Sequence, residues 1–187
     1  KNQAKQTNTG AISINTGEFT GRSPLDRFIV KDSLTEDTVW WGNINIPFKE
    51  QNFNKLYEKI VKHLSNKEIY VRDVYACANK DYQMNIRVIN EYPWSNMFAH
   101  NMFLRLNQNE IKDFTPEWTI LNAPEFMADA KIDGTRQHNF AILSFSKKII
   151  LIGGTAYTGE IKKGIFSALN FILPHQKDVL SMHCSAN

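Results

Sequence analysis

Three side chains able to act on an anion follow a glycine-rich turn near the end of the chain. Tyr157, Lys162 and Lys163 lie in residues 153–164, which read GGTAYTGEIKKG. Cations at the start of a helix oppose its dipole by about 0.3–1 kcal/mol. An anionic ligand, or a metal site with acidic partners, would explain the two lysines there. The alternative is that they are an ordinary pair of solvated lysines.

A further cation, Arg22, lies in the loop TGEFTGRSP at residues 16–24. Gly21 permits a close approach of the backbone to a ligand, and the guanidinium can hold a carboxylate with two hydrogen bonds. The alternative is a solvent-facing arginine in a turn. Tyr157 fits either the core or a ligand site, and the glycines around it favour a position on a loop.

His183 fits three roles: a core histidine, a metal ligand or an acid–base group. Cys184 follows it, but no second Cys or His has the spacing of a zinc site. The polar turn containing Asp129, Asp133 and Arg136 has no assigned role. The chain also lacks G-x-x-x-x-G-K-[ST], a G-x-G-x-x-G after a strand and G-x-S-x-G, so it has anion-binding parts without a nucleotide loop.

The elements that must position these residues begin with the apolar run at residues 149–152, IILI. This run predicts a strand covered on both faces, as in a parallel or mixed sheet. Gly153 ends the strand, and apolar residues at helical spacing then predict a helix that Pro174 closes. Open α/β sheets bind ligands where strands end in such loops.

The rest of the chain supplies further helices and strands. An amphipathic helix is predicted from Phe53 to Leu64 and another from an N-cap at Ser95. Residues 1–17 read as a loosely structured lead-in. Together these patterns predict an α/β (mixed α+β) fold, with a mixed sheet flanked by three helices. Its predicted strands cover residues 27–31, 68–76, 85–92, 118–121, 140–145 and 148–152, with the second and third, and the last two, paired as hairpins.

The composition restricts the class of protein. A chain of 187 residues with a net charge of +3 fits one domain, and no Lys/Arg run longer than a pair suggests nucleic acid. No apolar run approaches the ~20 residues that span a bilayer. Two cysteines without a signal segment indicate a reducing compartment, so we expect a cytoplasmic protein. Its ends, Lys1 and Asn187, suggest a piece of something longer.

Taken in order, the segments at residues 20–24 (TGRSP), 153–164 and 182–187 (MHCSAN) resemble ATP-dependent phosphoenolpyruvate carboxykinase. The resemblance extends through residues 94–106 and 136–145. It implies the N-terminal domain of the carboxykinase fold, with residues 1–187 as one substrate-side domain truncated before the phosphate-loop domain. The family converts oxaloacetate and ATP into phosphoenolpyruvate, carbon dioxide and ADP, in gluconeogenesis.

The resemblance also implies roles for individual residues. Arg22, Tyr157 and Lys163 would bind oxaloacetate, while Lys162 would lie near the transferring phosphoryl group. Lys163 and His183 would be ligands of Mn²⁺ on the ATP side of the site, and Mg²⁺ would accompany ATP. A lysine that binds a metal must be deprotonated, so Lys163 should have a lowered pKa.

The phosphate loop, a metal-binding Asp and a further substrate Arg of the family would lie beyond Asn187. The remainder of the polypeptide is therefore an expected partner, and residues 1–187 alone are expected to be inactive. Two other hypotheses remain: a non-catalytic anion-binding or interaction domain that retains the fold, and another kinase or phosphotransferase with a similar substrate domain.

Overall fold

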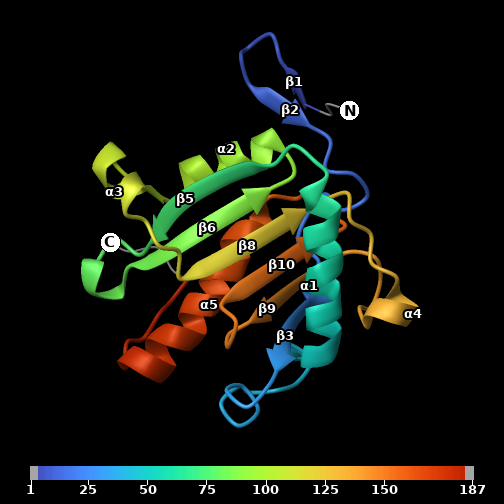
Figure 1. The fold of residues 1–187 in the computed structure, drawn as a ribbon, viewed down its shortest axis with the longest axis vertical. Helices are drawn as coiled ribbons and strands as arrows, with labels where there is room; N and C mark the ends of the chain where they lie inside the picture. Colours follow the sequence, from blue (N-terminus) through green and yellow to red (C-terminus); the bar gives the residue numbers. More distant parts are fainter. Residues whose placement is uncertain (1–3, 184–187) are drawn as a thin grey trace.

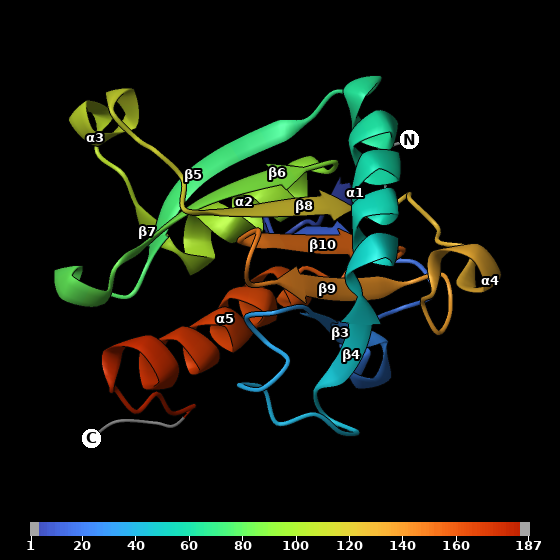
Figure 2. The same cartoon turned by 60° about the horizontal axis from the view of Figure 1, so that its bottom comes forward.

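The computed structural model describes residues 4–183 and is organised around an eight-stranded mixed sheet. The strands lie in the order β4-β3-β9-β10-β8-β6-β5-β7. Figure 1 shows α1 in front of this sheet, with α2 and α5 behind it, and Figure 2 shows the same layers after a rotation. The fold class predicted from the sequence, a mixed sheet flanked by helices, is confirmed.

The helices and strands alternate irregularly along the chain. The helices are α1 (Glu50–Ser65), α2 (Pro93–Met102), α3 (Gln108–Lys112), α4 (Ala130–Asp133) and α5 (Gly159–Lys177), with 3-10 turns η1 (Pro24–Asp26) and η2 (Lys80–Tyr82). The strands are β1 (Ala4–Gln6), β2 (Ile12–Ile14), β3 (Arg27–Lys31), β4 (Ile46–Lys49), β5 (Tyr70–Ala76), β6 (Met84–Asn90), β7 (Leu104–Arg105), β8 (Trp118–Ala123), β9 (Phe140–Ser144) and β10 (Ile149–Gly153).

The strand directions bring several loops to one edge of the sheet. Strands β6, β8 and β10 are parallel and end together at Asn90, Ala123 and Gly153. Strand β9 is antiparallel to β10, and β3 is parallel to β9, so β3 and β9 begin at this same edge with Arg27 and Phe140. We call it the Gly153 edge.

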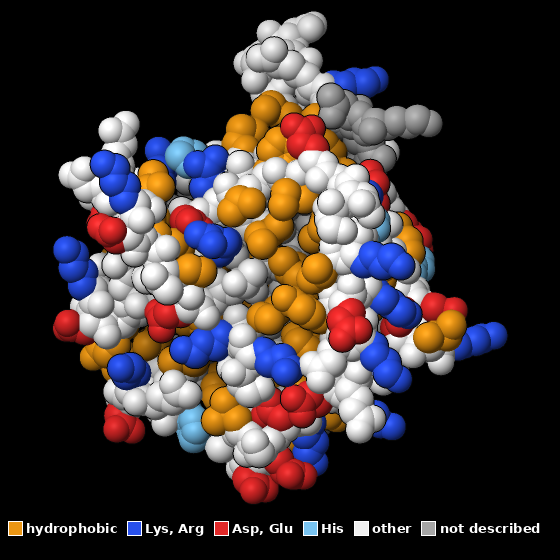
Figure 3. Space-filling model, in the orientation of Figure 1, with side chains coloured by type: hydrophobic (Ala, Val, Ile, Leu, Met, Phe, Trp, Pro, Cys, Tyr) orange, Lys and Arg blue, Asp and Glu red, His pale blue; other side chains and the backbone are white. Residues whose placement is uncertain are grey.

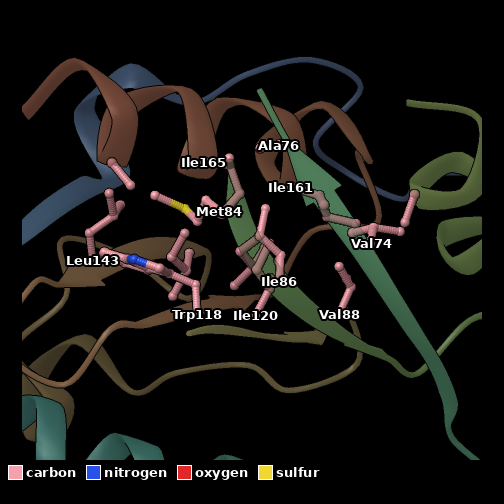
Figure 4. Packing of buried hydrophobic residues seen from close by; sticks show 14 of the residues in the cluster. Val74, Ala76, Met84, Ile86, Val88, Trp118, Ile120, Leu143, Ile161 and Ile165 are labelled. Carbon is pink, nitrogen blue, oxygen red and sulfur yellow. The ribbon is translucent and has the colours of Figure 1, made fainter. Parts of the chain in front are cut away.

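Strand β10 is buried on both faces, as its apolar run predicts. Ile150 and Ile152 pack in the cluster beneath α2 and α5, while Leu151 packs in the cluster beneath α1. Figure 4 shows Ile161 and Ile165 reaching from α5 into the first cluster. Helix α5 approaches β10 closely where it has no side chain: a Cβ on Gly164 would lie 3.1 Å from the Ile150 Cδ1 atom.

Helix α1 covers the opposite face of the sheet. It confirms the predicted amphipathic helix, because its buried residues recur at helical spacing: Phe53, Leu56, Ile60 and Leu64. Figure 3 shows a band of apolar side chains down the middle of this face. Val61 on α1 and Val71 on β5 are among the exposed large hydrophobic residues. Within residues 4–183, no helix is long and apolar enough to cross a membrane.

The two predicted hairpins are confirmed, but other strands differ from the prediction. β5 pairs with β6, and β9 pairs with β10, both antiparallel. The predicted lead-in instead contains the β1–β2 hairpin, which projects from the sheet (Figure 1). Strands β4 and β7 were not predicted. Both are short, at four and two residues, and depend on pairing with distant strands rather than on their own pattern.

Two helix boundaries also differ from the prediction. Ser95 is not an N-cap, because α2 begins at Pro93, where the fixed φ of proline suits the first helical position. Pro174 does not close α5, which continues to Lys177. Proline there removes one hydrogen bond in the penultimate turn. The helix ends instead at Asp178, whose backbone is left-handed (φ 52°) and whose N–H donates to the Leu173 carbonyl.

Candidate functional site

Two loops that are far apart in sequence meet at the Gly153 edge. One precedes β3 and carries Arg22; the other follows β10 and leads into α5. The backbone N–H of Ser23 donates to Oε1 of Glu160 at 3.3 Å. Glu160 lies in the first turn of α5 and is only 3% exposed. The contact brings the residue next to Arg22 onto the helix start that carries Lys162 and Lys163.

Arg27, the first residue of β3, strengthens this connection. Its Nη2 atom donates to the Lys163 carbonyl at 3.1 Å and to the Ser167 hydroxyl at 2.8 Å. Its Nε atom lies 3.5 Å from Oε2 of Glu160. A single guanidinium therefore fastens the beginning of β3 to the first three turns of α5.

Positive charge predominates where these segments meet. Burial lowers the pKa of Lys163, and the neighbouring charges of Arg22 and Lys162 lower it further. Burial raises the pKa of the Glu160 carboxyl, although the charge of Arg27 opposes that shift. Arg22 and Lys162 themselves are exposed. Arginine and lysine charges crowded around one buried acid favour an anion as the ligand.

Lys163 and His183 share a neighbour. The Lys163 ammonium lies 5.0 Å from the centroid of the Phe166 ring, and the His183 ring meets the same ring edge-on at 5.2 Å. Among residues 4–183, no three or more His, Cys, Asp and Glu side chains gather as a metal-binding group. The metal-ligand role of Lys163 and His183 stays a prediction. Cys184 lies outside the described residues.

Tyr157 occupies the loop between β10 and α5, as the flanking glycines predict. Its backbone N–H donates to the Thr155 hydroxyl at 3.1 Å, and its ring lies against Gly159 so closely that a Cβ there would meet Cε1 at 2.4 Å. The side chain is half-buried. The structure thus holds Tyr157 beside the start of α5, and its role as a substrate ligand stays a prediction.

Gly154 sets the path of this loop. Its φ of +68° belongs to the left-handed region, and a Cβ would lie 2.5 Å from the backbone oxygen of His138. Only glycine meets both conditions without displacing the backbone. The conformation at Gly154 therefore directs the chain from β10 toward Tyr157 and α5.

Most residues of the polar turn that had no assigned role make contacts that stabilise the fold. Arg136 forms a two-point ion pair with buried Asp26, at 2.8 Å for each contact. Asp133 is buried and accepts hydrogen bonds from Lys59 and from the Asp129 N–H. Because Asp26 ends the turn before β3, its pairing with Arg136 fixes the end of the Arg22 loop.

Sequence reasoning missed Arg27 and gave Glu160 no role. Arg27 occurs at the start of a predicted strand, where no spacing connects it to α5. Glu160 was visible at the glycine-rich junction beside the two lysines, but its partner residues lie more than a hundred positions earlier. In the sheet, β9 lies between β3 and β10. Only this strand order brings these residues together.

Comparison with known proteins assigns the chain to a family. Residues 1–187 match the family described as phosphoenolpyruvate carboxykinase. The phosphoenolpyruvate carboxykinase (ATP) of Flavobacterium johnsoniae is 65% identical over 185 residues, covering 99% of this chain and 35% of the relative. The protein of the same name from Christiangramia forsetii is 63% identical with the same coverage.

A more distant relative, the phosphoenolpyruvate carboxykinase (ATP) of Amoebophilus asiaticus, is 50% identical over 178 residues, which are 95% of this chain and 34% of the relative. The chain spans about a third of the length of the curated relatives that it matches.

Proposed function

This chain belongs to the ATP-dependent phosphoenolpyruvate carboxykinase family, and we propose that the whole protein converts oxaloacetate and ATP into phosphoenolpyruvate, carbon dioxide and ADP. Residues 1–187 form its N-terminal, substrate-side domain in this proposal. The observation that supports it best is the Ser23–Glu160 contact, since it brings the Arg22 loop to the helix start that carries Lys163. Two segments that the family uses for substrate thus lie at one place.

Arg22, Tyr157 and Lys163 bind oxaloacetate in this proposal. Arg22 is exposed and therefore free to hold a carboxylate through two hydrogen bonds. Loss of carbon dioxide leaves an enolate, and fixed positive charges stabilise that developing anion. The enolate oxygen then attacks the γ-phosphoryl group, where Lys162 offsets negative charge on the transferring group.

The surroundings of Lys163 fit a metal ligand, since its lowered pKa favours the neutral amine that binds a metal. Lys163 and His183 would hold Mn²⁺, while Mg²⁺ would accompany ATP on the same side. Mn²⁺ would supply Lewis-acid stabilisation of negative charge on the substrate. Titration of the whole protein with Mn²⁺ tests this assignment: undiminished affinity in both Lys163→Ala and His183→Ala would contradict it.

The proposal includes a setting for the activity. The reaction would serve gluconeogenesis in the cytoplasm, with oxaloacetate as the small-molecule substrate. Because the chain covers only 35% of the Flavobacterium johnsoniae relative, the remaining polypeptide is its natural partner and would supply the phosphate loop. We expect residues 1–187 alone to form no phosphoenolpyruvate.

Substitution of Arg22 in the whole protein tests the proposed function. Arg22→Ala should raise the KM for oxaloacetate by about 10- to 100-fold, because a hydrogen bond to a charged group contributes about 1.5–3 kcal/mol. Arg87→Ala is the matched control, since Arg87 pairs with Asp73 between β5 and β6. The KM of Arg87→Ala for oxaloacetate should equal that of the wild type.

Two results would overturn parts of this proposal. An unchanged KM in Arg22→Ala would remove Arg22 from the substrate pocket. A wild-type protein that binds oxaloacetate without forming phosphoenolpyruvate would instead favour a non-catalytic anion-binding domain.

A further inference from the structure

We infer that Glu160 and Arg27 are positioning residues that hold Arg22 and Lys163 at a fixed separation. The inference rests on the proposed function, since it concerns the same site. Neither residue needs to touch substrate for this role. Glu160 acts through the backbone of Ser23, the residue next to Arg22, and Arg27 acts through the backbone of Lys163.

The contacts form a continuous bridge between the two substrate segments. It runs from the Ser23 N–H to Glu160, from Glu160 to the Arg27 guanidinium, and from that guanidinium to the Lys163 carbonyl. One end is the residue that follows Arg22, and the other end is the backbone of Lys163 itself. A shift of either bridging side chain would therefore change the distance between the two proposed substrate contacts.

The charges at this place favour such a bridge. Arg22, Lys162 and Arg27 place positive charge around Lys163, and Glu160 is a buried acid beside the same cations. Burial lowers the pKa of Arg27, the charge of Glu160 opposes that shift, and the charge of Arg22 adds to it. The Glu160 carboxylate therefore offsets part of the repulsion between these cations.

Stability alone does not explain the pair. Nε of Arg27 and Oε2 of Glu160 are both buried and make no hydrogen bond within the described residues, although they lie 3.5 Å apart. Buried charges with incomplete hydrogen bonding contribute little to stability and often less than apolar residues of similar size. Their position is better explained by the geometry that they impose on Arg22 and Lys163.

A double-mutant cycle in the whole protein tests the inference. Glu160→Gln keeps the shape and an acceptor for the Ser23 N–H but removes the charge. It should lower kcat/KM for oxaloacetate by about 10- to 100-fold, because misplacement by about 1 Å has effects of this size. The KM for ATP should stay within about twofold. In an Arg22→Ala background, Glu160→Gln should cause little further loss, because both changes remove the same contact.

Asp133→Asn is the matched control. Asp133 is also a buried carboxylate bound by a cation and a backbone N–H, but its partners are Lys59 and Asp129 on α1 and beside α4. The Asp133→Asn variant should have a lower thermal midpoint of unfolding and an unchanged kcat/KM for oxaloacetate. A purely structural role for Glu160 would give this same pattern.

The outcomes separate this inference from the proposed function. Full additivity of Glu160→Gln and Arg22→Ala, or unchanged kinetics in Glu160→Gln, overturns the inference alone. A wild-type protein that forms no phosphoenolpyruvate overturns both. If Glu160→Gln fails to fold, Arg27→Lys replaces it in the cycle, because lysine keeps the charge but cannot reach Lys163 and Ser167 together. The same coupling to Arg22 is then required.

Discussion

At the scale of single residues, buried carboxylates determine much of the local structure. Each of four buried acids meets at least one basic side chain, and each such contact joins segments distant in sequence. The pairs are Asp26 with Arg136, Glu91 with His63 and Lys67, Asp133 with Lys59, and Glu160 with Arg27. Because an unpaired buried charge is costly, these pairs restrict how the loops can be arranged.

The ion pair of Lys67 with Glu125 should make stability depend on pH. Lys67 donates to Glu125 at 2.7 Å and Tyr92 donates to it at 3.0 Å, and these contacts hold the pKa of the Glu125 carboxyl below its ordinary value of 4.5. A carboxyl whose pKa is lower in the folded than in the unfolded state stabilises the fold at pH values above the unfolded-state pKa. That contribution disappears as the pH falls through the folded-state value.

Glu125→Gln should therefore lower the free energy of unfolding at pH 7, by no more than about 1 kcal/mol because Glu125 is largely exposed. The difference from wild type should shrink as the pH falls below about 4.5. Urea unfolding at pH 7 and at acid pH measures both values. Glu36→Gln, in the exposed pair with Lys31, is the control. A difference that grows in acid would contradict the prediction.

The sequence singled out candidate site residues but not the residues that contact them. Arg22, Tyr157 and Lys163 stood out because glycines surround them in motifs that resemble a known family. Arg27 did not, since its importance comes from the Lys163 carbonyl and the Ser167 hydroxyl, which lie about 140 positions later. Pairing over such distances follows from strand order, which no local pattern in this chain specifies.

At the scale of elements, the strand–loop–helix unit from β10 to α5 organises the site. The strand and the amphipathic pattern of the helix were predicted because both signals are local. The end of α5 was not: the helix continues past Pro174 to Lys177, and the His175 ring lies 5.1 Å from the Phe171 ring. Pro174 removes a single backbone hydrogen bond, and that loss alone does not end the helix.

Gly154→Ala tests the path of the loop within this unit. The Cβ would lie 2.5 Å from the His138 oxygen and would require a left-handed conformation at φ +68°. We expect a loss of about 2–4 kcal/mol in the free energy of unfolding, combining backbone strain with overpacking. Gly42→Ala is the control, because no atom lies within 4 Å of its Cβ position and its φ is not positive.

Urea unfolding measures the effect of Gly154→Ala. A loss no larger than that of Gly42→Ala would show that the backbone at residues 138 and 154 adjusts freely. The close approach would then not determine where the loop places Tyr157.

At the scale of the whole molecule, the β9–β10 hairpin joins two parts of the sheet. On one side, β9 pairs with β3; on the other, β10 pairs with β8. Removal of this hairpin would separate the β3–β4 pair from the rest of the sheet and would uncover both hydrophobic clusters. The fold class was predictable because six of the strands and the longer helices have local patterns, whereas this order of strands was not.

A chain ending at residue 139 should therefore lose cooperative unfolding. It keeps α1, α2 and the β5–β6 hairpin, so helical and strand signals should persist in part while the sharp urea transition disappears. Deletion of residues 1–14 is the control, because β1 and β2 form a separate two-stranded sheet. A sharp transition in the shorter chain would show that β3 and β4 pack without β9.

The position of β3 beside β9 also has a consequence during synthesis. Arg27 pairs with Ala141, and at ribosomal rates of roughly 5–20 residues per second the partner strand emerges roughly 6–23 s later. For that interval the nascent chain presents an apolar strand with a vacant edge. Its sequence, RFIVK, carries a cation at each end, and such flanking charges oppose aggregation of exposed strands. The same Arg27 that later joins α5 thus first protects the strand it begins.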